Sequence, residues 1–130
     1  MVMVKALSYG SGTFEIANLL QFQNVDYLGV AFADEGVFLR KSGITVPIIV
    51  MNPEEQSFES MIEYNLEPEI YSFRTLKSFT AAVNKMSFKA YPIHIKLETG
   101  MNRLGFLESE IDELISELEI KPELSICSIF

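Results

Sequence analysis

The sequence contains little of several residue types, and each shortage excludes a class of protein. Its 130 residues include one cysteine, one histidine and no tryptophan. Cys127 alone cannot form an internal disulfide. The sequence has only one histidine as well, so there are few conventional ligands for zinc. So little cysteine is typical of proteins of the reducing cytoplasm. We therefore expect no disulfide, no metal site and a cytoplasmic location.

Positive charge is also scarce. The sequence has ten lysines and arginines and 18 aspartates and glutamates, which gives a formal net charge of −8 at pH 7. Proteins bind nucleic acids mainly through basic side chains that contact phosphates, and no basic run is present here. We expect no nucleic-acid partner.

Long apolar runs are missing, although the chain is 48% hydrophobic with a mean hydropathy of +0.21. The longest clean run, residues 48–51 with Val46 before it, is far too short to span a bilayer. Residues 1–5 lack the basic and long apolar regions of a signal peptide. We expect no membrane partner, and we attribute the hydrophobicity to a densely buried α/β core.

Short apolar segments do recur along the chain, and they predict strands. Several are almost continuously apolar, which is typical of parallel strands that are buried on both faces. The predicted strands are residues 1–5, 25–31, 47–51, 69–72, 91–98 and 124–130.

Helical patterns lie between these strands. Residues 13–22, 33–42, 52–65 and 73–86 are predicted helices, and a further helix begins near residue 109. Thr13, Asn52 and Ser109 are the expected N-caps, because their side chains can accept hydrogen bonds from the first free backbone amides of a helix. At Asn52 the signal is reinforced by Pro53 and by Glu55 as a capping box.

Five β-then-α units followed by a strand indicate an α/β fold with parallel strands. A closed (β/α)8 TIM barrel needs eight strands and about 250 residues. An open sheet and an incomplete barrel both fit the six strands. Because the sequence begins and ends within predicted strands, we favour a partial barrel of about six strands and five helices, with residues 1–130 as a truncated N-terminal barrel domain. The unpaired strand edges predict self-association of this fragment.

The end of the fifth predicted strand carries an unusual number of charges. Polar residues alternate with apolar ones, which places His94, Lys96 and Glu98 on one face of the strand. Arg103 follows in a turn flanked by glycines. Active sites of parallel α/β folds lie at the carboxyl ends of strands, but a half-solvated strand would show the same alternation. Lys96 could equally pair with Glu98, and we interpret His94 as a hydrogen-bonded interior histidine.

Two motifs resemble those of a known family. Residues 4–12 read Val-Lys-Ala-Leu-Ser-Tyr-Gly-Ser-Gly, which resembles the cofactor-lysine motif of alanine racemases, Val-Lys-Ala-x-x-Tyr-Gly-x-Gly. Residues 94–106 read His-Ile-Lys-Leu-Glu-Thr-Gly-Met-Asn-Arg-Leu-Gly-Phe, which resembles the second motif, His-x-Lys-x-(Asp/Glu)-Thr-Gly-Met-x-Arg-x-Gly. Residues 34–44 and 47–50 resemble the segment between them. The resemblance covers nearly the whole chain in the right order.

The resemblance implies the pyridoxal 5'-phosphate barrel of alanine racemase and a role for each matching residue. Lys5 would hold the cofactor as a Schiff base and act as one of two catalytic bases, on the D-alanine side. Tyr9 would reach the cofactor phosphate. Arg103 would bind the phenolic oxygen of the cofactor and the substrate carboxylate, and Lys96, which is carbamylated in some relatives, would orient Arg103.

The resemblance also implies the activity of the parent protein. That activity is interconversion of L-alanine and D-alanine by an isomerase that acts as a homodimer and supplies D-alanine for peptidoglycan. The second base, a tyrosine, and the C-terminal β domain lie outside this sequence, so we expect the chain alone to be inactive. The alternatives are another amino-acid racemase on the same barrel and a non-catalytic half-barrel interaction module. Residues 99–103 argue against the basic amino-acid decarboxylases.

Overall fold

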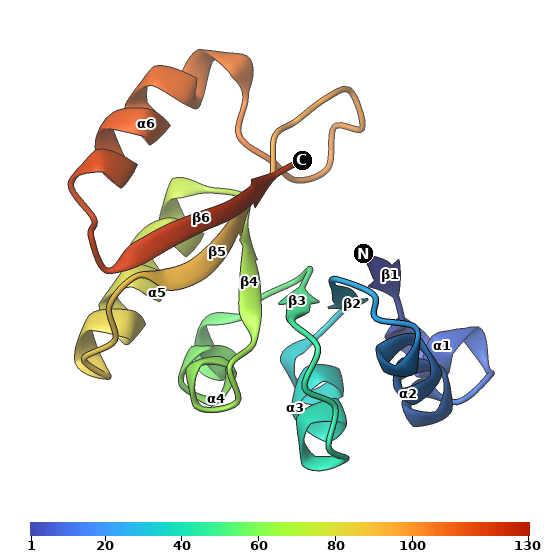
Figure 1. The fold of residues 1–130 in the computed structure, drawn as a ribbon. Helices are drawn as coiled ribbons and strands as arrows, with labels where there is room; N and C mark the ends of the chain where they lie inside the picture. Colours follow the sequence, from blue (N-terminus) through green and yellow to red (C-terminus); the bar gives the residue numbers. More distant parts are fainter. The chain divides into compact units, whose positions relative to one another are not determined.

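The computed structural model describes residues 1–130 and divides into two compact units, Met1–Pro68 and Glu69–Phe130. Strands alternate with helices along the chain (Figure 1), and each strand pairs in parallel with the next. The strands are β1 (Val2–Met3), β2 (Leu28–Val30), β3 (Ile48–Val50), β4 (Glu67–Ile70), β5 (Tyr91–Ile95) and β6 (Leu124–Ile129). The helices are α1 (Lys5–Tyr9), α2 (Thr13–Phe22), α3 (Ala33–Lys41), α4 (Phe58–Glu63), α5 (Phe73–Lys85) and α6 (Ile111–Glu119), with 3-10 turns η1 (Glu55–Ser57) and η2 (Glu108–Glu110).

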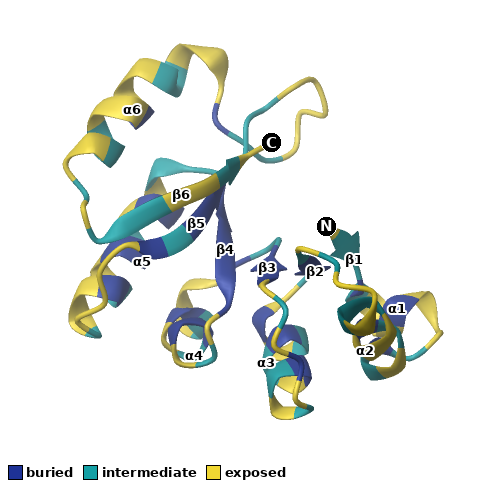
Figure 2. Cartoon of the chain, in the orientation of Figure 1, coloured by how far each residue is buried: buried dark blue, intermediate teal, exposed yellow.

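Parallel strands form the core of the first unit. β2 and β3 are buried along their whole length (Figure 2), as their continuous apolar sequences predict. Gly29 of β2 allows a close approach, because a Cβ there would lie 2.4 Å from the Met3 sulfur. Gly36 does the same for α3, where a Cβ would lie 2.8 Å from a Leu66 methyl group.

The second unit is built around β5. Ile93 and Ile95 are buried, and the ring of Phe79 from α5 packs edge-on against Tyr91 with centroids 5.5 Å apart. α6 is far less covered (Figure 2): of its apolar residues only Leu114 is buried. Ile115, the residue after Leu114, is 51% exposed.

The predicted α/β class is confirmed, with six parallel strands. The five predicted helices correspond to α2 through α6, although most elements are shorter than expected. The additional element is α1, which occupies residues that we predicted as the end of a strand and a loop.

All three predicted N-caps are wrong. Gly12 precedes α2, and Thr13 is its first residue and is buried. The amide side chain of Asn52 donates to the carbonyl of Ala31, 3.3 Å away, so it binds the segment after β2 instead of capping a helix. Helical structure begins only at η1. Ser109 lies within η2, and the carboxylate of Glu110 accepts the free amide of Leu107 at 2.7 Å instead.

None of the helices is both long enough and apolar enough to cross a membrane.

Candidate functional site

The first motif forms a left-handed turn directly after β1. Ala6, Leu7, Ser8 and Tyr9 all have positive φ angles, between 50° and 57°. The left-handed conformation costs an L-residue roughly 1–2 kcal/mol, and four such residues in succession are rare. Strain of this kind persists only where the surroundings enforce it and is concentrated at functional sites. The turn is therefore the strongest local indication of a site in the first unit.

The carboxylate of Glu35, in the first turn of α3, holds this turn in place. Its Oε1 accepts the amide of Ala6 at 2.8 Å. Its Oε2 accepts the amides of Ala31 at 2.7 Å and Phe32 at 3.1 Å. One side chain thus joins the segment after β1 to the segment after β2.

Lys5 opens the turn and Tyr9 closes it. Lys5 is half-buried, whereas Tyr9 is 69% exposed. Gly10 follows with a φ of 96° and donates its amide to the carbonyl of Leu7 at 3.1 Å. The amine of Lys5 can form an imine with an aldehyde, and the hydroxyl of Tyr9 can donate to a phosphate oxygen, so both side chains are chemically compatible with pyridoxal phosphate.

The second motif begins at the end of β5 and continues as a loop, not as a longer strand. β5 ends at Ile95, and Leu97 forms a parallel bridge to Phe106. The amide of Glu98 donates to the carbonyl of Phe106, and the amide of Phe106 donates to the carbonyl of Lys96, both at 2.9 Å. These bonds close residues 98–105 into a loop at the carboxyl end of β5.

Glu98 organises this loop from within. Its carboxylate accepts the backbone amides of Gly100 and, at 3.2 Å, of Arg103. Hydrogen bonds from the backbone amides of Asn102 and Gly100 lower the pKa of Glu98, because they stabilise the ionised form. Arg103 itself is exposed and lines a pocket of about 200 Å³ together with Glu98.

Lys96 pairs with a residue of β4. Its Nζ lies 2.9 Å from Oε1 of Glu69, whose side chain is 2% exposed. The pairing with Glu98 that we considered from the sequence is therefore wrong. Burial raises the pKa of Glu69, and the charges of Lys96, Arg103 and His94 oppose that rise. The role of Lys96 in orienting Arg103 stays a prediction.

His94 is fully buried, and its Nδ1 lies 2.7 Å from the hydroxyl of Ser128 on β6. The interpretation of His94 as a hydrogen-bonded interior residue is confirmed.

Two glutamates at these strand ends were missed from the sequence. Glu69 lies within the short strand β4, and a charged residue in a buried strand is expected to be paired. Glu35 stands at the third helical position of α3, where a carboxylate can accept free amides at the start of a helix. The sequence shows neither partner, Lys96 or Ala6, because each lies more than 25 residues away: 96−69 is 27 and 35−6 is 29.

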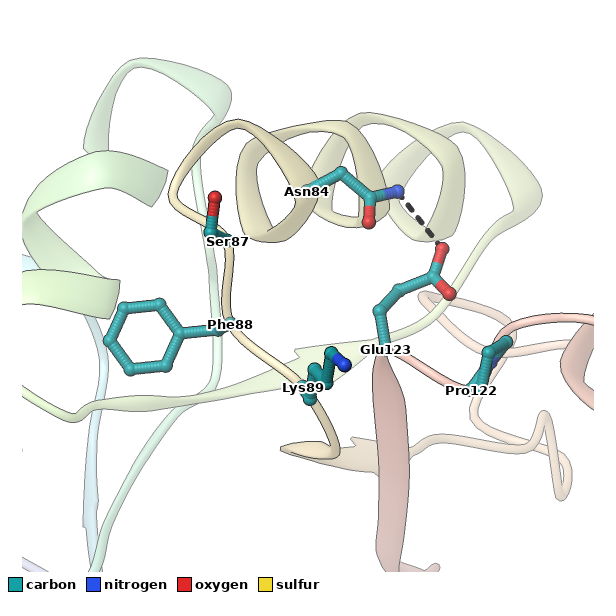
Figure 3. Close-up of a pocket in the computed structure, with 6 residues that line it drawn as sticks. All are labelled: Asn84, Ser87, Phe88, Lys89, Pro122 and Glu123. Atoms are coloured by element: carbon teal, nitrogen blue, oxygen red, sulfur yellow. Dashed lines mark hydrogen bonds between the residues drawn. The ribbon is translucent and has the colours of Figure 1, made fainter.

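A larger pocket, of about 350 Å³, lies elsewhere in the second unit (Figure 3). It is lined by Asn84, Ser87, Phe88, Lys89, Pro122 and Glu123, and Asn84 Nδ2 donates to Glu123 Oε1 at 3.0 Å. Its residues immediately precede β5 and β6. This is the amino end of these strands, opposite to the end where parallel α/β folds place active sites.

Relatives of known sequence cover the chain from end to end. The alanine racemase of Thermodesulfovibrio yellowstonii is 40% identical over 114 residues, which are 88% of this chain and 31% of the relative. That of Clostridium tetani is 36% identical over 132 positions, covering 100% of this chain and 34% of the relative. The chain therefore spans about a third of the length of these relatives.

Solved structures match the fold. Alanine racemase of Clostridium difficile in complex with cycloserine is 33% identical with a TM-score of 0.92, over 99% of this chain and 36% of that one. Alanine racemase of Bartonella henselae, described with covalently bound pyridoxal phosphate, is 27% identical with a TM-score of 0.84, over 98% and 38%. The predicted partial-barrel fold is confirmed by these matches. The alanine racemase N-terminal domain family matches residues 1–130, and the chain belongs to this family.

Proposed function

We propose that the parent protein interconverts L-alanine and D-alanine with pyridoxal 5'-phosphate, and that residues 1–130 carry the Lys5 half of its site. The observation that carries the proposal is the left-handed turn at the end of β1. Lys5 begins this turn and Tyr9 ends it, and three amide hydrogen bonds to Glu35 hold the segments around it. Strained backbone that side-chain hydrogen bonds maintain is expected where a side chain must be placed accurately.

Each residue has a chemical task in this proposal. The amine of Lys5 holds the cofactor and takes or returns the α-proton of alanine on the D-alanine side. The hydroxyl of Tyr9 donates to the cofactor phosphate. The guanidinium of Arg103, a planar donor suited to oxygen pairs, binds the phenolic oxygen and the substrate carboxylate. When bound, pyridoxal phosphate supplies an electron sink for the charge left after proton removal.

The remainder of the site belongs to the rest of the parent protein. We propose that the tyrosine that acts as the second base, the C-terminal β domain and the homodimer interface all lie outside residues 1–130. On this basis the chain alone does not racemise alanine. The parent protein acts in the cytoplasm and supplies D-alanine for peptidoglycan.

Reductive trapping tests the proposal. The full-length protein is incubated with pyridoxal phosphate, reduced with borohydride and digested, and the labelled peptide is identified by mass spectrometry. We expect the label on Lys5, its loss in K5R and its retention in K77R, because Lys77 is an exposed lysine of α5. A full-length protein that takes up no label on Lys5 contradicts the proposal and favours the non-catalytic interaction module.

The substrate is tested separately. Full-length protein with cofactor should convert L-alanine to D-alanine, measured by chiral chromatography, and K5R should abolish the conversion. Faster conversion of a different amino acid would instead support another racemase on the same barrel.

A further inference from the structure

The pocket of about 350 Å³ in the second unit lies between two segments that are bonded to each other just before β5 and β6. The amide of Tyr91 donates to the carbonyl of Glu123 at 2.8 Å, and Nδ2 of Asn84 donates to Oε1 of Glu123 at 3.0 Å. Figure 3 shows Asn84, Lys89 and Glu123 around one space between the end of α5 and the start of β6. Hydrogen bonds between its walls therefore fix the shape of this pocket.

The loop between α5 and β5 has an unusual backbone conformation. Ser87 and Ala90 have positive φ angles, of 59° and 52°. The end of α5 explains the first, because the amide of Ser87 donates to the carbonyl of Asn84 at 3.0 Å as the helix closes. Ala90 is not at a helix end, and the left-handed conformation strains an alanine. Such strain is concentrated where a side chain must be presented, and here it follows Lys89 directly.

Opposite charges line this pocket without pairing with each other. Lys89 is exposed and forms no ion pair. Glu123 is half-buried, and Asn84 is the only hydrogen-bond partner of its side chain. One carboxylate oxygen of Glu123 and the amine of Lys89 are therefore available to a ligand. Phe88 and Pro122 add apolar lining.

A ligand of this pocket has to carry both charges. Glu123 would repel a simple anion, Lys89 would repel a simple cation, and an uncharged ligand would remove water from both groups without replacing its hydrogen bonds. A free α-amino acid offers an ammonium group to Glu123 and a carboxylate to Lys89, and its side chain can lie against the apolar lining. We propose that this pocket binds a free α-amino acid with an apolar side chain. The pocket contains none of the residues that we assign to the cofactor, so the proposal does not rest on the proposed function.

Calorimetric titration of the full-length protein with L-leucine tests the proposal. We expect saturable binding that becomes at least about tenfold weaker in K89M and in E123Q, because each variant removes a charged partner of the ligand. E123Q keeps the length of the side chain and can still accept the hydrogen bond from Asn84. K77M and E119Q are the matched controls, since each removes one exposed charge from the same unit, and both should bind as the wild type does. Absence of binding to the wild type, or unchanged binding to K89M and E123Q, overturns the proposal.

Ligand analogues test the same contacts without any variant. N-acetyl-L-leucine lacks the ammonium group, L-leucinamide lacks the carboxylate, and glycine lacks the apolar side chain. Each should bind the wild type at least about tenfold more weakly than L-leucine. If K89M or E123Q does not fold, these affinities decide the question, and affinities equal to that of L-leucine overturn the proposal.

The K5R variant separates this pocket from the proposed cofactor site. Lys5 belongs to the first unit, so K5R should bind L-leucine as tightly as the wild type does. Binding that is lost in K5R and retained in K89M and E123Q would assign L-leucine to the cofactor site and overturn the proposal. None of these measurements uses racemisation, so their failure is distinct from failure of the trapping experiment at Lys5.

Discussion

Oε1 of Glu35 accepts the backbone amide of Ala6 at 2.8 Å, and Ala6 is the residue that follows Lys5. The other carboxylate oxygen is bound to the amides of Ala31 and Phe32 after β2. The position of the candidate catalytic lysine therefore depends on a glutamate 30 residues further along the sequence, since 35−5 is 30.

Replacing Glu35 should release the turn. We expect E35A to lower the free energy of unfolding by about 1–3 kcal/mol, because three amides lose a charged acceptor that is only partly exposed. Urea denaturation measures this, and borohydride trapping at Lys5 should fall in parallel. E63A, the same truncation at an exposed glutamate of α4, should alter stability by less than about 0.5 kcal/mol. Equal effects of the two substitutions would contradict the role of Glu35.

Gly105 permits the close contact that shapes the loop of residues 98–105. Its φ is 133°, and a Cβ there would lie 2.6 Å from the backbone nitrogen of Glu98 and 2.6 Å from the carbonyl carbon of Leu97. G105A should cost about 2 kcal/mol or more, from strain plus a backbone clash. G100A provides the matched control, since Gly100 also has a positive φ, of 118°, but faces open space. Urea midpoints should place G105A well below G100A, and the reverse order would show that the contact is unimportant.

The stability of the loop of residues 98–105 should fall at acidic pH. Amide hydrogen bonds hold the pKa of Glu98 below its ordinary value of 4.5, so the ionised form is favoured in the folded state. Its contribution to stability is then fully present above pH 4.5 and is lost as the pH falls through the lowered value. An NMR titration of the Glu98 carboxyl carbon should give a midpoint under 4.5, and amide signals of Gly100 and Arg103 should shift with it. A midpoint at or above the ordinary value would exclude these hydrogen bonds in solution.

Arg40 connects α3 to two loops of the first unit. Its guanidinium donates to four carbonyls at 2.7 to 3.0 Å: those of Ile44, Val46, Tyr64 and Asn65. A lysine cannot reproduce this planar set of donors, so R40K should lower stability by about 2 kcal/mol. K41R is the control: it keeps the positive charge at the neighbouring position and should change stability little. Thermal unfolding followed by circular dichroism compares the two variants. An unchanged melting temperature of R40K would show that these hydrogen bonds add no net stability.

Much of the architecture follows from local sequence. Runs such as residues 48–50 are apolar on both faces and could only be buried strands, and the stripe of Leu76, Phe79 and Val83 on α5 is buried as its spacing predicts. Gly43, with a φ of 92°, follows the C-terminus of α3, which is the position where glycine most often ends a helix. The cap predicted at Asn52 is wrong because a capping side chain can hydrogen-bond a distant backbone group instead. Asn52 shows this directly, since its amide binds the carbonyl of Ala31.

The sequence by itself determined the α/β class, the order of strands and helices, and the two motifs that carry Lys5 and Arg103. These depend on hydrophobic periodicity and on spacing between neighbours, which are local properties. Only the tertiary structure decided that Lys5 sits in a left-handed turn tied to Glu35, and that Lys96 pairs with Glu69 rather than Glu98. Parallel strands are joined through helices, so residues that meet at their carboxyl ends are separated by a whole β-α unit. Local pattern carries no information about which charge a buried side chain will find there.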